Sequence, residues 1–170
     1  DFNGEGMLDA ATANSYSTGP AYSVTILLRQ ADESYVRSDF TLASNPAFLI
    51  SGDVNVDGHV DLIVGNGTVN TMSVFLGNGD GTFAAPAEYM TGTSPNAAVL
   101  SNLNGDGWPD LAVACGSANV VSILLGTGSG IFGTRTDVTT RTGTSEVVSA
   151  DFNSDSLQDL ATLGSAVNGV

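Results

Sequence analysis

Four copies of one acidic ten-residue pattern are spaced almost evenly along the chain. The second copy, at residues 53–62, reads Asp-Val-Asn-Val-Asp-Gly-His-Val-Asp-Leu, and related copies occupy residues 1–10, 102–111 and 151–160. Their starts at residues 1, 53, 102 and 151 are separated by 52, 49 and 49 residues. A fixed period of this size is typical of propellers, solenoids and other arrays of repeated units. We therefore interpret residues 1–170 as one repeat array whose last repeat is incomplete.

Each repeat is predicted to hold four β-strands and no helix. The strand that follows the acidic pattern is a short apolar run, and the next strand is rich in β-branched and aromatic residues. The strands that follow the pattern are expected at residues 62–64 and 111–113. The next strands are expected at residues 24–28, 72–76 and 121–125.

Glycine-dense turns are expected to lead into the third strand of each repeat. These turns occupy residues 77–81 and 126–130. The third strand is predicted to start at Phe83 in one repeat and at Phe132 in the next. Residues 95–100 and 144–150 are predicted as fourth strands, and their small side chains suit a crowded innermost position. The first repeat holds four extra residues, through residues 15–20, which are expected to extend a surface loop.

These strands predict an all-β fold of β-propeller blades, each with four antiparallel strands. The chain holds about three and a half repeats, whereas closed propellers typically contain about four to eight blades. Further repeats, a second chain by self-association, or an open stack could complete the array, and the sequence favours further repeats. The chain starts inside a repeat without Met, so we expect a longer precursor with a secretion signal.

The acidic pattern places oxygen ligands at alternating positions, as a loop does when it wraps around a cation. Positions 1, 3, 5 and 9 carry Asp, Asn or Glu, position 7 can offer its backbone carbonyl, and Gly at position 6 permits a sharp turn. Hard oxygen ligands of this kind suit Ca²⁺, and we expect one ion per loop, up to four in all. The predicted ligands are Asp1, Asn3, Glu5, Met7 and Asp9 in loop 1 (residues 1–9); Asp53, Asn55, Asp57, His59 and Asp61 in loop 2 (residues 53–61); Asn102, Asn104, Asp106, Trp108 and Asp110 in loop 3 (residues 102–110); and Asp151, Asn153, Asp155, Leu157 and Asp159 in loop 4 (residues 151–159).

The four loops are predicted to be unequal. Loop 2 has the full ligand set, whereas Asn102 leaves loop 3 one carboxylate short and should lower its affinity. Ser156 replaces the turn glycine of loop 4 and would be strained at a positive φ. Glu5 is one methylene longer than the Asp at that position elsewhere. The alternative, that these residues merely form turns, explains four copies in register less well.

Composition restricts the classes of partner. The net charge is −14, and only four basic residues occur, all of them Arg, so the basic surface that binds nucleic acid is missing. No run approaches the roughly 18 apolar residues that insert into a membrane. Of the 18 acidic residues, 11 lie within the four patterns, where cations are expected to bind.

Catalysis is not predicted. His59 is the single His and lies in loop 2, so the single Cys, Cys115, has no free base beside it and is interpreted as a buried core residue. Asn66 begins the one glycosylation sequon, which is expected at an exposed turn. Trp108 and Tyr16 could stack on a sugar, although Trp108 beside Pro109 could equally shield its own loop.

The acidic pattern, together with Val-Phe-Leu-Gly-Asn-Gly-Asp-Gly-Thr-Phe at residues 74–83, resembles the FG-GAP/VCBS repeat family over essentially all 170 residues. Such repeats are similar to those of the integrin alpha-subunit propeller. The resemblance implies a seven-bladed propeller with calcium in the hairpin between the first two strands of a blade. It also implies an extracellular or cell-surface protein that serves adhesion or binds a protein or glycan ligand. The departures at Glu5, Asn102 and Ser156 concern individual sites rather than the fold.

Two other functions remain open at this point. The chain could be a repeat subunit of a surface assembly or filament, because its repeat count is incomplete at both ends. It could also be a non-catalytic module of a larger secreted enzyme.

Overall fold

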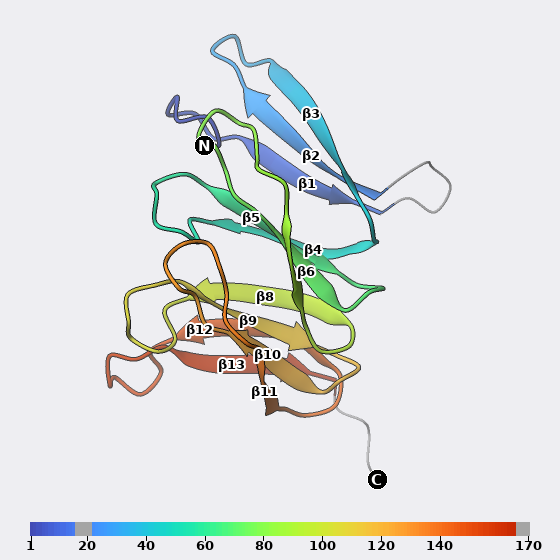
Figure 1. The fold of residues 1–170 in the computed structure, drawn as a ribbon, viewed down its shortest axis with the longest axis vertical. Coiled ribbons are helices and arrows are strands. Elements are labelled where there is room, and N and C mark those ends of the chain that lie inside the picture. Colours follow the sequence, from blue (N-terminus) through green and yellow to red (C-terminus); the bar gives the residue numbers. More distant parts are fainter. Residues whose placement is uncertain (16–21, 166–170) are drawn as a thin grey trace.

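The computed structural model describes residues 1–15 and 22–165, which form thirteen β-strands in four antiparallel sheets (Figure 1). The first sheet contains β1 (Ala10–Asn14), β2 (Tyr22–Arg29) and β3 (Tyr35–Leu42). The second sheet contains β4 (Pro46–Gly52), β5 (Asp61–Asn66), β6 (Thr71–Phe75) and β7 (Ala87–Met90). The third sheet contains β8 (Pro95–Ser101), β9 (Asp110–Cys115), β10 (Val120–Leu124) and β11 (Thr136–Thr139). The fourth sheet contains β12 (Thr144–Ala150) and β13 (Asp159–Gly164).

This arrangement confirms the predicted all-β fold with propeller-type blades. In every sheet the strands are ordered as in the sequence, and each pairs antiparallel with its neighbour. The second and third sheets have the full four strands, whereas the first has three and the fourth has two. Within the described residues, no helix is long and apolar enough to cross a membrane.

The sheet boundaries differ from the prediction in one respect. The strands expected to end each repeat, at residues 95–100 and 144–150, are β8 and β12, and they open the following sheet instead of closing the preceding one. Their innermost position is confirmed, because β8 lies against both β4 and β12. Loops 2, 3 and 4 are consequently hairpins between the first and second strands of a sheet.

The predicted start of the third strand was wrong. Phe83 and Phe132 form only single bridges, to Gly77 and Gly126, and the strands β7 and β11 begin a few residues later. In the second sheet, Pro86 lies between the bridge and β7 and has no N–H to donate to a ladder.

These two aromatic rings join neighbouring repeats. Phe83 makes edge-to-face contacts with Phe2 and Phe40 of the first repeat, at centroid distances of 5.8 and 5.7 Å. Phe132 makes the same kind of contact with Tyr89 of the second sheet at 5.4 Å. Edge-to-face pairs add to the energy of apolar burial, so the rings help to fix one sheet on the next.

The core lies between successive sheets. Apolar side chains of the second and third sheets form one cluster, which includes Ile63, Met72, Leu111 and Leu124. Similar clusters pack between the first and second sheets and between the third and fourth sheets. Every residue of β5 and β9 is buried, since these strands are covered on both faces, and this explains their apolar runs at residues 62–64 and 111–113. In Figure 1 the first, second and third sheets follow one another along the long axis, and β12 of the fourth sheet lies against β8 and β9 of the third. The insertion at residues 15–20 lies, apart from Ser15, outside the described residues.

Candidate metal centre

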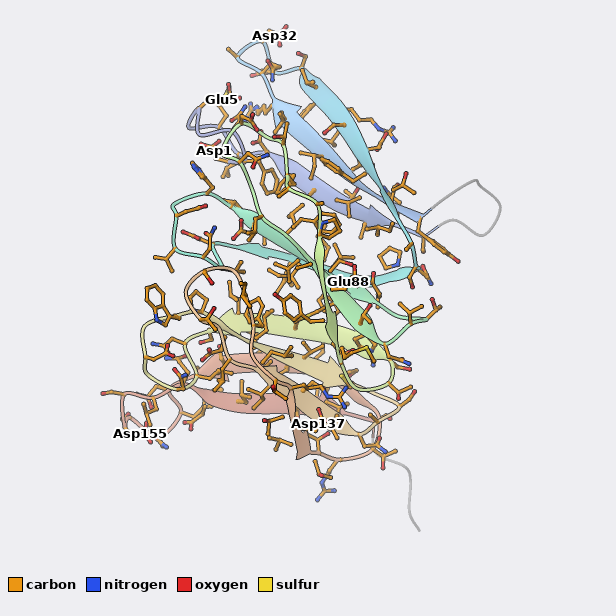
Figure 2. The ribbon with its side chains drawn as sticks, in the orientation of Figure 1. Asp1, Glu5, Asp32, Glu88, Asp137 and Asp155 are labelled. Atoms are coloured by element: carbon orange, nitrogen blue, oxygen red, sulfur yellow. The ribbon has the colours of Figure 1, made fainter. Side chains whose placement is uncertain are left out.

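The four acidic loops lie on one side of the array. Loops 2, 3 and 4 connect β4 to β5, β8 to β9 and β12 to β13, and loop 1 precedes β1. Figure 2 shows Asp1, Glu5 and Asp155, from loops 1 and 4, projecting on the same side of the molecule. The repeated hairpin thus gathers most of the acidic side chains at one edge of the sheets.

Loop 2 is organised by hydrogen bonds from its own backbone. Asp53 accepts the N–H groups of Asp57 at 3.2 Å and Gly58 at 2.9 Å, one on each carboxylate oxygen. Asn55 accepts the Asp57 N–H at 3.2 Å and donates its amide to Asp57 Oδ2 at 2.8 Å. Asp57 Oδ1 accepts the His59 N–H at 2.8 Å. Positions 1, 3 and 5 are therefore brought together, as the sequence predicted.

Loops 3 and 4 repeat this hydrogen-bond frame. The amide of the position-3 Asn donates to the position-5 carboxylate at 2.8 Å in loop 3 and at 3.0 Å in loop 4. The position-5 carboxylate accepts the position-7 N–H at 2.8 Å in both. At position 1, Asn102 accepts one backbone N–H, whereas the Asp151 carboxylate accepts three. Loop 3, which has Asn102 instead of a carboxylate at position 1, therefore has fewer hydrogen bonds at that position than loop 4.

Loop 1 follows the frame only in part. Asp1 accepts the N–H groups of Gly4 and Gly6 at 2.8 and 2.7 Å, and Asn3 accepts that of Glu5 at 3.3 Å. Within the described part of the chain, the Glu5 carboxylate accepts no hydrogen bond, and its residue is exposed. The longer side chain of Glu5 therefore leaves position 5 without the anchor that Asp has in the other loops.

The position-9 carboxylates face a second set of partners. Asp61 is fully buried, and its two oxygens accept the N–H of Val54 at 2.8 Å and that of Gly77 at 2.7 Å. Asp110 is also fully buried and binds Leu103 and Gly126 in the same way. Each of these carboxylates therefore links its loop to the backbone just after the third strand of the sheet, which is β6 for Asp61 and β10 for Asp110.

Asp9 and Asp159 occupy the same position in loops 1 and 4. Asp9 accepts the N–H groups of Phe2 and Arg29, whereas Asp159 accepts that of Phe152. Position 9 was predicted to be a cation ligand, and its clamp was missed, although the sequence has Asp at this position in all four copies of the pattern.

The environment of Asp61 is unfavourable for its charge. Burial raises the pKa of the Asp61 carboxyl, and the nearby Asp57 and Asp53 charges raise it further, against hydrogen bonds from Gly77 and Val54 that lower it. A cation beside these three carboxylates would relieve that repulsion. The pKa of Asp57 is instead lowered, chiefly by hydrogen bonds from His59 and Asn55.

The side chain at position 7 serves packing. His59 lies over Gly79 and Trp108 lies over Gly128, so closely that a Cβ on either glycine would collide with the ring. Trp108 remains 41% exposed. Trp108 was expected to stack on a sugar or to shield its own loop, but its ring covers Gly128 in the neighbouring glycine hairpin.

The sharp turn predicted at position 6 is confirmed. Gly58 has φ 87° and Gly107 has φ 91°, and Ser156 adopts φ 71°, as its strain prediction required. Position 4 was missed: Val56 has φ 59° and Ser154 has φ 65°, conformations that L-residues other than glycine rarely adopt. The glycines at position 4 of loops 1 and 3 were the available signal.

The donor chemistry fits a hard cation, since the converging groups are carboxylate and amide oxygens. Each carboxylate oxygen has two lone-pair sites, so accepting one N–H leaves capacity for an ion. Among the residues described, however, no three His, Cys, Asp or Glu side chains are placed so that they could hold a metal together. The loops therefore present the predicted ligand types on a common frame without a formed carboxylate cluster.

The sequon enters a turn at residues 67–70, where Thr68 is exposed, but its acceptor Asn66 is buried. Asn66 ends β5, is 4% exposed, and donates its side-chain amide to Thr71, Ser73 and Glu88. The turn was predicted, but the Asn66 amide is used in a buried network, so the folded chain offers no free acceptor for a glycan there.

Comparable networks recur in the neighbouring sheets. Thr25 accepts from Asn14 at 2.9 Å and donates to Asp39 at 2.5 Å, and Ser122 donates to Asp137 at 2.8 Å beside Cys115. Cys115 is buried, as expected, and burial raises the pKa of its thiol. These groups cross-link strands and were not predicted from the sequence.

The fold and the loops together define a β-propeller-type repeat module. The family model described as FG-GAP-like repeat matches residues 53–101 and 102–162, more than half of the chain. The chain therefore belongs to the FG-GAP repeat family. A search of curated proteins finds no match.

Proposed function

We propose that the chain is an extracellular, calcium-stabilised propeller-type module that binds a protein or glycan ligand in adhesion and has no catalytic role. Calcium would be structural, with loop 2 the strongest site. The ligand class and the extracellular setting rest on the family to which the chain belongs. Binding at the submillimolar to millimolar calcium levels typical of extracellular modules is expected.

The repeated hydrogen-bond frame carries this proposal. In loops 2, 3 and 4 the position-3 oxygen accepts the N–H of position 5, and the position-5 carboxylate accepts the N–H of position 7. A turn alone needs only some of these hydrogen bonds. A bound cation needs several oxygens held at fixed positions, and the same positions are held in each of these loops.

Charge supports the same conclusion. Four divalent cations would change the formal net charge from −14 to −6, a value ordinary for a soluble domain. The ions would also bind next to the buried Asp61 carboxylate, whose pKa is raised by burial and by the charges of Asp57 and Asp53. An ion that binds only the folded loop stabilises the fold by mass action.

Calcium titration by calorimetry, with thermal unfolding in calcium and in chelator, tests the proposal. Asp57→Ala and Asp106→Ala should each remove part of the calcium-dependent rise in Tm. Asp32→Ala is the matched control, because Asp32 is an exposed carboxylate outside the four loops. Identical unfolding curves of the unmodified chain in calcium and in chelator would defeat the calcium assignment.

Specificity for calcium is tested with magnesium in the same titration. Magnesium demands near-ideal octahedral geometry and dehydrates reluctantly, so it should raise Tm less than calcium at equal concentration. Equal effects of the two ions would indicate general charge screening instead of loop binding.

A further inference from the structure

Four Asn-Gly dipeptides lie in the described part of the chain: Asn3-Gly4, Asn66-Gly67, Asn78-Gly79 and Asn104-Gly105. Asn followed by Gly is prone to deamidate, because the glycine nitrogen can approach the Asn side-chain carbon without hindrance from a Cβ. Reaction requires that nitrogen to be free of other hydrogen bonds. A fifth dipeptide, Asn168-Gly169, lies outside the described residues.

In three of the four, the glycine N–H already donates to a fixed acceptor. The bonds are Gly4 to Asp1 Oδ1 at 2.8 Å, Gly67 to Asn45 O at 2.9 Å, and Gly105 to Asn102 Oδ1 at 2.9 Å.

The Asn side chains of two of these dipeptides are held as well. Asn66 is buried with its amide shared among three acceptors. Asn104 both accepts from and donates to Asp106. Attack at either position requires the loss of several hydrogen bonds at once.

Asn78 differs from these three. It is exposed in the hairpin between β6 and β7, and its amide nitrogen donates to Thr82 Oγ1 at 2.8 Å. Within the described residues, neither the Asn78 side-chain carbonyl oxygen nor the Gly79 N–H takes part in a hydrogen bond. The attacking nitrogen is therefore not held by a hydrogen bond, and the Asn78 side-chain amide is held through Nδ2 alone.

We propose that Asn78 is a site of spontaneous deamidation in the folded protein. The Gly79 nitrogen loses its proton and bonds to Asn78 Cγ, and the bond from Cγ to Nδ2 breaks. The side-chain amide, with that proton, leaves as ammonia, and a five-membered succinimide remains. Water then opens the ring at one of its two carbonyls and gives either aspartate or isoaspartate, with no oxidant or reductant involved.

The product would alter the surroundings of loop 2. Gly79 lies beneath the His59 ring, and the neighbouring Gly81 N–H donates to Phe2 O of loop 1 at 2.9 Å. Isoaspartate lengthens the hairpin backbone by one methylene, and either product adds a negative charge there. Modification at Asn78 thus acts on the hairpin that joins the first two repeats.

The folded chain is incubated in mildly alkaline buffer at constant calcium, then digested with pepsin in acid, and the peptides are analysed by mass spectrometry. Asn78 should convert at least about tenfold faster than Asn66 or Asn104, a factor equivalent to the net loss of one backbone hydrogen bond. In urea the three rates should become similar. Asn78→Gln should abolish conversion at residue 78 and leave Asn66 and Asn104 unchanged.

Two results would overturn the proposal. One is conversion of Asn66 or Asn104 in the folded chain as fast as that of Asn78. The other is a rate at Asn78 that folding suppresses as strongly as the rates at the other two sites.

Discussion

Asp61→Ala should destabilise the fold even when no calcium is present. The Asp61 carboxylate is fully buried and accepts two backbone N–H groups, from Val54 and Gly77. Alanine would leave both donors without a partner inside the protein. An unsatisfied buried donor costs about 1–3 kcal/mol, so two would cost about 2–6 kcal/mol.

Part of that cost is offset. Burial raises the pKa of Asp61, which shows that its charge is held at an energetic disadvantage that alanine would remove. We therefore expect the free energy of unfolding to fall by about 2–4 kcal/mol. Asp61→Asn keeps one acceptor oxygen and should lose about half as much.

Urea unfolding of each variant in chelator measures this free energy. Asp159→Ala is the matched control, since Asp159 is only part-buried at the same loop position and accepts one backbone N–H, from Phe152. Its loss should be within about 1 kcal/mol. If Asp61→Ala were as stable as the unmodified chain in chelator and less stable only in calcium, the clamp would be refuted and the residue would act solely as a ligand.

Three further outcomes are expected. Ser156→Gly should raise the free energy of unfolding by about 0.5–1 kcal/mol in urea melts, because Ser156 has φ 71°. Gly126→Ala should lower the free energy of unfolding by about 2 kcal/mol or more, since the new Cβ would collide with Pro109 O. Gly133→Ala should be neutral, because its Cβ would lie 3.5 Å from the nearest atom, Leu125 O. A hydrogen bond from Thr25 lowers the pKa of Asp39, so the ionised carboxylate stabilises the fold at pH values above 3.8, and this stabilisation is lost as the pH falls. Asp39→Asn should therefore make Tm fall less steeply in acid.

Strands could be predicted from the sequence where their own residues form an apolar run. β5 and β9 were predicted because strands covered on both faces need continuous apolar runs. The third strand was misplaced because Phe83 has the side chain of a strand residue but packs between two repeats. Its partners, Phe2 and Phe40, lie far away in the sequence, so local composition could not reveal its role.

The loops show the same division. Alternating oxygens and the turn at position 6 follow from the chain's local geometry, and both were predicted. The clamp made by Asp61 depends on Gly77, which is brought near by strand pairing. The turn after β5 was predicted, but the burial of Asn66 was missed, because its acceptors Ser73 and Glu88 come from the next two strands.

The clamp also explains how an ion in one loop would affect more than that loop. Asp61 fixes Gly77, the first residue of the hairpin between β6 and β7. Gly81 in that hairpin donates to Phe2 O, and Phe83 packs on the Phe2 ring, so the hairpin of the second repeat is fastened to loop 1. Because loops 1 and 2 are thus joined through one hairpin, calcium in either should stabilise the boundary between the first two sheets, and its loss should loosen neighbouring repeats together.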